Sequence, residues 1–254
     1  MFAPSLNNNL SGLGSLGTVW EQWSSGASTF NGVADLTFEH YETTVPYNAA
    51  KKQGSLIFNN CGQLRFGYLA VGSGGKPLCA FNNCMSVQID SYYAVHGERY
   101  AVTAEAFMTG MEVANTVVQI GKAMLSGPNG IPFAIGKGGA VYLSSFFASG
   151  VSCIAVITNQ AEYLTTFADS TDNPTWKSWG KLVIGSGETL YMNQSGQVLA
   201  ARPSVLIQSD AQEETFVSIK NLRNIFAHNG FTGADERYYI RNESNFAEIY
   251  LDGC

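Results

Sequence analysis

Short apolar runs separated by Gly, Asn and Ser constrain the fold of this chain more than any other feature. The run VADLTFEHY, residues 33–41, alternates apolar and polar side chains, which is the period of a half-buried strand. The runs GSLIF, QLRFGYLAV, SVQIDSYY and RYAVTAEAF follow, with turn-forming segments such as NNCG and GSGGKP between them. The pattern predicts a mainly β protein built of many short strands.

One segment fits a helix better than the rest. In TGMEVANTVVQIGKAMLSGPNG, residues 109–130, apolar side chains recur every three or four positions, at Val113, Val117, Ile120 and Met124. A threonine before this run can cap a helix, and the Gly-Pro pair after it would end one. The β-branched residues and the internal glycine disfavour a helix. The segment therefore predicts one short helix, with a pair of strands as the alternative.

Length and local composition suggest three parts. A chain of 254 residues can form one large β domain or two modest ones. We predict a flexible amino-terminal arm over residues 1–30, a β-rich domain over 31–170 and a smaller β-sandwich domain over 171–254. The polar stretch NQAEYLTTFADSTDNP places the boundary near residue 170. Regularly spaced short strands favour antiparallel units of the sandwich or jelly-roll type.

The charge of the chain narrows the classes of partner. Charged residues make up 13% of the sequence and the net charge is −6, against about 25% charged residues in an average soluble chain. A surface poor in charge suits a protein that is covered by other subunits, and a free, neutral β-rich protein is the alternative. The sequence contains no basic cluster of the kind that predicts nucleic-acid binding. No apolar run reaches the ~18 to 20 residues of a membrane-spanning helix, so we expect no membrane insertion.

The tetrapeptide FNNC occurs twice, at Phe58–Cys61 and at Phe81–Cys84. Asn tolerates left-handed backbone conformations, so each copy reads as a turn between two strands. In an antiparallel meander Cys61 and Cys84 would lie two strands apart, at ~10 Å, whereas a disulfide needs Cα atoms within ~7 Å. Zinc needs about four ligands, and no second Cys or His pair accompanies the cysteines. The sequence thus favours a repeated turn over a disulfide or a metal site, and it implies no cofactor.

The chain has five cysteines, and this odd number is one of two indications of the compartment in which the chain folds. The first residues lack the basic and apolar regions of a secretory signal. Together these features predict folding in a reducing compartment.

The search for catalytic motifs predicts that the chain is not an enzyme. The three histidines are isolated, and neither GSGGKP nor GKGG completes a phosphate-binding loop. The segment Asp169–Asn173 offers oxygen ligands but lacks the full calcium-loop pattern. Carboxylate pairs such as Glu39 and Glu42 leave a glycan-degrading enzyme open, because sequence spacing does not show whether two carboxyl groups face each other.

Two tryptophans are the candidate ligand-binding residues. Trp176 and Trp179 lie three positions apart in the turn-rich segment PTWKSW. Exposed together, they would form a stacking surface for sugar rings. The alternative is that one or both fill the core of the carboxy-terminal domain.

Two longer segments resemble a known class of protein. TTFADSTDNPTWKSWGKLVIG is similar to segments of tailed-bacteriophage fibre and receptor-binding proteins, and ERYYIRNESNFAEIYLDG resembles the closing strands of phage sandwich domains. The resemblance covers some 40 of the 254 residues. It implies a structural component of the virion that is assembled in the host cytoplasm, as a tail, fibre or capsid-decoration protein.

The predicted function combines this resemblance with the low charge. We expect a structural homo-oligomer whose partners are copies of itself and other virion proteins, joined through its arm and its β domains. The alternative function is a carbohydrate- or receptor-binding module of a phage tail or head fibre, with a host surface glycan as its ligand.

Overall fold

The structure, a computed structural model, describes residues 15–23, 28–44, 56–72, 79–95, 108–151, 153–158, 180–192, 205–209, 215–227 and 240–254. Within these ranges the chain forms β-strands and no helix, so no described helix is long and apolar enough to cross a membrane. The strands are β1 (Ser15–Trp23), β2 (Ser28–Asn31), β3 (Asp35–Thr44), β4 (Leu56–Asn59), β5 (Gln63–Gly72), β6 (Cys79–Asn82), β7 (Ser86–Val95), β8 (Met108–Ala114), β9 (Val117–Ile135), β10 (Gly139–Val151), β11 (Ala155–Ile157), β12 (Gly180–Ile184), β13 (Gly187–Met192), β14 (Val205–Ile207), β15 (Thr215–Lys220), β16 (Leu222–Ala227), β17 (Ile240–Asn242) and β18 (Ala247–Asp252).

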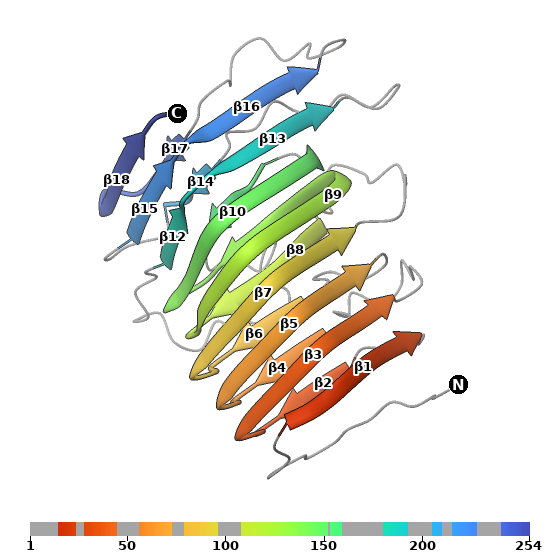
Figure 1. Ribbon diagram of the computed structural model, residues 1–254. Helices are drawn as coiled ribbons and strands as arrows, with labels where there is room; N and C mark the ends of the chain where they lie inside the picture. Colours follow the sequence, from red (N-terminus) through yellow and green to blue (C-terminus); the bar gives the residue numbers. More distant parts are fainter. Residues whose placement is uncertain are drawn as a thin grey trace.

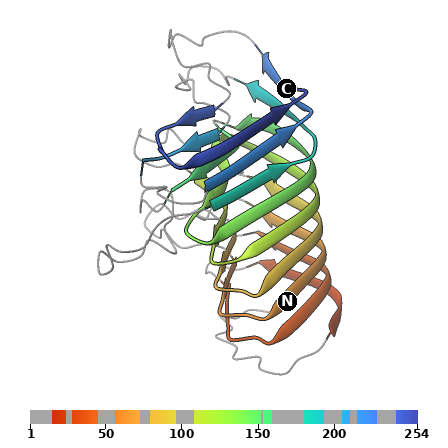
Figure 2. The same cartoon turned by 90° about the vertical axis from the view of Figure 1, so that its left-hand side faces the viewer.

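The strands wind into a parallel β-helix, and we call each turn of its coil a rung (Figures 1 and 2). The longer strands β3, β5, β7 and β9 pair in parallel, each with the longer strand of the next rung. The shorter strands β2, β4, β6 and β8 form a second parallel sheet in the same way. The two sheets meet in β9, whose first part pairs with β7 and β10 and whose last part pairs with β8 and β11.

The predicted antiparallel sandwich is wrong, because every strand pairing in the described residues is parallel. The prediction failed because alternation of apolar and polar residues places side chains on two faces of a strand and does not set its direction relative to a neighbour. A chain that coils reaches a parallel neighbour with short connections, since the strand of the other sheet carries it back across the body.

Equivalent positions of successive rungs form columns, and the inward columns make the core. Phe58 stacks between Phe30 and Phe81, with ring centroids 4.7 and 5.4 Å apart. This column then continues through Val113, Ile135, Ile157 and Ile207. Two further columns come from the longer strands: Leu36, Leu64, Val87, Val118, Val141, Leu182 and Val217, and Phe38, Phe66, Ile89, Ile120, Leu143, Ile184 and Ile219. All are buried, so one continuous apolar core runs along the β-helix.

Asparagine turns lead from the shorter strands into the longer ones, which confirms the turn predicted for FNNC. Asn60 and Asn83 both have φ of 53°, and Asn115 has φ of 46°. Asn and Gly are the residues that adopt this left-handed region at least cost. The turns also bond to one another along the stack, since Asn83 Nδ2 donates to Asn60 Oδ1 at 2.7 Å and Asn59 Nδ2 donates to Asn31 Oδ1 at 3.0 Å.

Cys61 and Cys84 follow these turns in adjacent rungs, so the predicted separation of two strands is wrong. Because β4 pairs directly with β6, and β5 with β7, the two cysteines are one inter-strand spacing apart, ~4.8 Å. Both thiols are free and buried, and they interact with each other. Each lies near a carbonyl of the rung before, with Cys61 Sγ 3.7 Å from Phe30 O and Cys84 Sγ 3.7 Å from Phe58 O.

The predicted short helix is also wrong, and its alternative, a pair of strands, is what forms. β8 and the first part of β9 occupy this segment, separated by the turn at Asn115. The turn at Asn115 shifts the alternation once, so Val113 is buried and Val117 is 39% exposed. A second shift at Gly121 and Lys122, which are both exposed, leaves Ile120 buried and Met124 44% exposed. A spacing of three to four residues arose here from two strands joined by a turn.

The carboxy-terminal part continues the same coil, so the predicted β-sandwich over residues 171–254 is wrong. β10 pairs in parallel with β12 and β13, which pair in turn with β15 and β16. At the other end, β1 and all of β2 except Asn31 fall within residues 1–30, and they pair with β3 and β4. The domain boundaries at residues 30 and 170 stay predictions.

Candidate functional site

The longer strands bend in the middle, where the alternation of buried and exposed residues is interrupted by two successive residues that are not buried. Asp90 with Ser91, Gly121 with Lys122, and Ser144 with Ser145 occupy this bend in β7, β9 and β10. At the bend the backbones approach closely, because a Cβ on Gly121 would lie 2.7 Å from the carbonyl oxygen of Asp90. The glycine therefore leaves a gap between the side chains of the rungs on either side.

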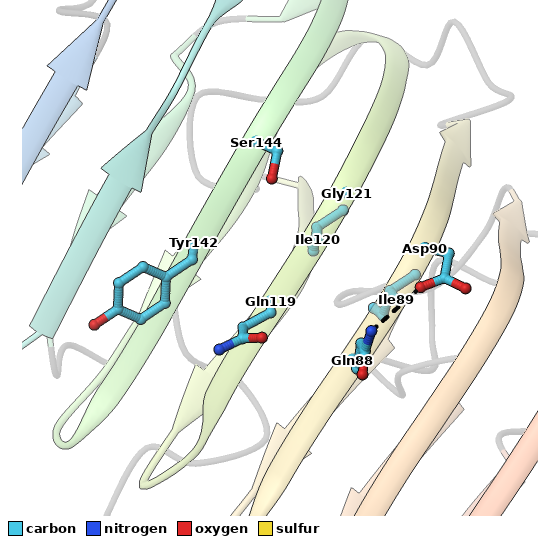
Figure 3. A pocket seen from close by; sticks show the side chains of 8 residues that line it. All are labelled: Gln88, Ile89, Asp90, Gln119, Ile120, Gly121, Tyr142 and Ser144. Carbon is cyan, nitrogen blue, oxygen red and sulfur yellow. Dashed lines mark hydrogen bonds between the residues drawn. The ribbon is translucent and has the colours of Figure 1, made fainter.

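A shallow hollow of about 260 Å³ opens at this gap, and we call it the polar notch. Its outward side chains are Gln88, Asp90, Gln119, Tyr142 and Ser144, while Ile89, Ile120 and Gly121 complete its lining (Figure 3). The three larger polar side chains form one column, because Gln88 pairs with Gln119 and Gln119 with Tyr142. The notch thus spans three rungs.

The polar groups of the notch are only partly used within the protein. Gln88 Nε2 donates to Asp90 Oδ1 at 3.4 Å, and Arg65 lies 4.0 Å from Asp90 Oδ2. Among the described residues the side chains of Gln119, Tyr142 and Ser144 have no hydrogen-bond partner. These groups face solvent, so they can bind a ligand without breaking a contact of the fold.

A second surface feature lies further along the same strands. Tyr93, Met124 and Phe147 occupy one outward column of β7, β9 and β10, and we call them the apolar row. Their exposed fractions are 38%, 44% and 37%. Single exposed apolar residues are common on soluble proteins, but three at paired positions of successive rungs form a patch, and patches mark interaction surfaces.

Charged side chains stand at both ends of the column that contains the apolar row. Before Tyr93 the column holds Glu42 and the buried Ala70, and after Phe147 it holds Glu188 and Arg223. Glu42 lies 3.5 Å from His40, and Arg223 lies 3.8 Å from Glu188. All four partners are exposed enough to exchange these contacts for others.

The buried titratable groups near the core are structural in character. Burial raises the pKa of the Cys79 thiol to about 12 and raises the pKa of Tyr92 well above its ordinary value, and the two side chains contact each other at 3.5 Å. The hydrogen bond from Cys84 lowers the pKa of Cys61 to about 7, and the same bond, together with burial, raises the pKa of Cys84. No described grouping of three or more His, Cys, Asp or Glu side chains could hold a metal ion.

The ligand-binding residues predicted from sequence, Trp176 and Trp179, lie outside the described residues, as does the segment Asp169–Asn173. Glu39 and Glu42 are both exposed on β3. The residues of the notch and of the apolar row were not among the residues predicted from sequence.

A signal for both features was present in the sequence. When VQIDSYY, VQIGKAM and VYLSSFF are aligned on their inward residues, the notch residues fall in two columns and the apolar row falls in a third. This alignment becomes visible only when the chain is read as a repeat, and repeats of 20 to 50 residues are typical of solenoids.

Comparison of the chain with protein-family models, with curated proteins and with solved structures gives no match.

Proposed function

We propose that the chain is a structural component of a bacteriophage particle, and that it assembles with copies of itself through the apolar row. The phage setting rests on the resemblance of TTFADSTDNPTWKSWGKLVIG to segments of phage fibre and receptor-binding proteins. The second segment adds no support, because it was likened to sandwich domains and its strands β17 and β18 pair in parallel. The observation that carries the assembly is the row itself, because Tyr93, Met124 and Phe147 expose adjoining apolar surface on three successive rungs. A stack of hydrogen-bonded rungs gives such a row a rigid backing, which keeps the ordering cost of association low.

A second copy of the chain fits this surface when it is related by a two-fold axis. The column reads Glu42, Ala70, Tyr93, Met124, Phe147, Glu188 and Arg223. With Met124 at the centre, the end residues Glu42 and Arg223 are each three rungs away, or ~14 Å at the usual strand spacing. Two antiparallel copies would place Glu42 of each opposite Arg223 of the other, as an isologous interface requires.

The solution mass of the purified chain, measured by light scattering, tests the proposal. We expect an oligomer whose mass does not change with reductant, because the contact needs no disulfide. Met124→Glu should shift the mass towards the monomer, since it places a charge at the centre of an apolar contact. Met85→Glu is the matched control, because Met85 is 71% exposed and lies on a turn away from the row. A wild-type monomer, or equal effects of the two variants, would contradict the proposal.

A charge exchange tests the two-fold arrangement separately. Glu42→Arg and Arg223→Glu should each weaken the oligomer, because each places like charges opposite one another. The double variant should restore it, since the pair is then reversed. An oligomer that loses mass in both single variants and stays dissociated in the double variant would rule out the antiparallel pairing while leaving the row as the interface.

A further inference from the structure

We propose that the polar notch is a binding site for a neutral oligosaccharide that lies along the axis of the β-helix. The notch presents two carboxamides, a carboxylate, a hydroxyl and an aromatic ring within one hollow of about 260 Å³. Hydroxyl groups of sugars both donate and accept hydrogen bonds, and side chains of these types complement them. A tyrosine ring adds an apolar surface on which the C–H face of a sugar can pack.

A purely structural role does not account for the amides. Glutamines at equivalent positions of adjacent rungs can hydrogen-bond to each other and so stabilise the stack. Here Gln88 instead bonds to Asp90 on its own strand, and the Gln119 carboxamide has no partner among the described residues. Figure 3 shows Gln88, Gln119 and Tyr142 side by side on three strands, with Asp90 and Ser144 at the bend beside them. Unsatisfied donors and acceptors on neighbouring rungs form a surface that a ligand can satisfy.

The charge of the notch favours a neutral ligand over an ion. Asp90 is the one carboxylate among the notch residues, and Arg65 lies 4.0 Å from it. A single compensated carboxylate does not supply the ligand number that a hard cation requires. An acidic ligand is not favoured either, because Arg65, the only cationic group paired with a notch residue among the described residues, is already matched by the Asp90 carboxylate. With a hard cation and an acidic ligand disfavoured, a neutral polyhydroxyl compound fits the notch best. Two neighbouring hydroxyl groups of such a compound can donate hydrogen bonds to one carboxylate.

The geometry further favours a chain of sugars over a single one. The column of Gln88, Gln119 and Tyr142 repeats polar groups at each rung, ~4.8 Å apart along the axis. The gap left by Gly121 lowers the middle of the site, so a ligand can cross from one rung to the next without meeting a side chain. Single subsites of this shallow kind bind weakly, and several in a line bind through the sum of their contacts.

Three neutral linear hexasaccharides, namely maltohexaose, cellohexaose and chitohexaose, serve as probes in calorimetric titration of the full chain. We expect at least one of them to bind, and the acidic hyaluronan hexasaccharide to bind at least tenfold more weakly. Gln119→Ala and Tyr142→Ala should each weaken binding at least tenfold, while Tyr142→Phe, which keeps the ring, should weaken it less. Gln63→Ala is the matched control, since Gln63 is also exposed on the same sheet but does not line the notch.

Each outcome decides for or against the site. No heat with any neutral probe at millimolar concentration overturns the inference. Binding that survives both alanine variants, or that is equally strong for hyaluronan, overturns it as well. The inference is independent of the proposed assembly, because Met124→Glu should change the solution mass and leave sugar binding intact. A monomeric protein that binds sugar, or an oligomer that does not, would separate the two proposals.

Discussion

The asparagine turns allow a sharp test of why FNNC is repeated. Asn83 has φ of 53°, and its Nδ2 donates a 2.7 Å hydrogen bond to Asn60 Oδ1 in the neighbouring rung. Asn83→Ala removes the bond and forces an unfavourable backbone region on alanine. Asn83→Gly removes the same bond but adopts this region freely. We therefore expect the glycine variant to be the more stable of the two, against the usual order in a strand.

The expected magnitudes follow from three contributions. The lost hydrogen bond costs about 1 kcal/mol in either variant. The left-handed conformation costs alanine about 1 to 2 kcal/mol, whereas Asn, whose short polar side chain can bond locally, and Gly adopt it routinely. The extra freedom of glycine in the unfolded chain costs about 0.5 to 1 kcal/mol. Asn83→Ala should thus lower the free energy of unfolding by about 2 to 3 kcal/mol, and Asn83→Gly by about 0.5 to 1 kcal/mol less than that.

Urea denaturation followed by circular dichroism measures these differences. Lys122 supplies the control pair, because it is exposed in the middle of β9 and has no positive φ. There Lys122→Gly should be about 0.5 to 1 kcal/mol less stable than Lys122→Ala. The order of the two variants should therefore reverse between the two sites. Reasoning from the left-handed turn would be refuted if alanine were the better replacement at both positions.

Three further predictions concern the core and the bend. Phe58→Ala should lower the free energy of unfolding by about 3 to 5 kcal/mol, because the ring is fully buried between two stacked rings. As a control, Phe246→Ala, at a residue 55% exposed, should lower it by under about 1 kcal/mol in the same denaturation assay. Similar losses in the two variants would contradict the assigned core. The folded pKa of Cys79 is about 12 against an ordinary 9.0. The folded state therefore holds this proton after the unfolded chain has released it, and stability should fall from pH 9 to 12 by up to about 1.4 kcal/mol per pH unit. Cys79→Ala should flatten this decline in urea melts between pH 8 and 11, and parallel curves would refute the linkage. Gly121→Ala should lower the free energy of unfolding by about 1 to 3 kcal/mol, because the added Cβ would lie 2.7 Å from the carbonyl oxygen of Asp90. An unchanged melting temperature would contradict this and show that the bend relaxes.

The sequence predicted the strands and turns better than the way in which they pair. Alternation in residues 33–41 located β3, and the two asparagines of FNNC identified the turns that the structure confirms. Both signals are local, since they depend on side-chain period and on the φ values open to asparagine. The pairing of β4 with β6 is not local, and alternation fits parallel and antiparallel neighbours equally. The sandwich prediction chose the commoner arrangement, and it was wrong.

The repeat itself held the information that was missing. Phe58 and Phe81 pair with each other, and so do Asn59 and Asn82. Two copies of a turn that stack in register belong to adjacent rungs of a coil. In a meander, two such turns would lie at the same end of the sheet but two strands apart. The separation of ~10 Å expected for Cys61 and Cys84 assumed the meander, and it was twice the spacing of adjacent rungs.

The candidate site follows from the same register, which is why the sequence reveals it only when the chain is read as a repeat. Inward columns such as Phe38, Phe66, Ile89 and Ile120 stay apolar along the stack, because each side chain packs on its equivalent in the next rung. The outward residues before and after each inward residue are free of this constraint. The residues before it form the column Gln88, Gln119 and Tyr142, and the residues after it form the column Asp90, Gly121 and Ser144.

This separation has a consequence for how the chain can acquire function. A substitution in an outward column changes the chemistry of one surface and leaves the stacking of the core intact, because the two lie on opposite faces of the same strand. Gln119 and Met124 both face outward on one strand, β9, on either side of the bend at Gly121, and only Gln119 lines the notch. A ligand in the notch and a second copy on the apolar row would therefore contact different residues of the same three rungs. Simultaneous loss of both activities in a single outward variant would contradict that independence.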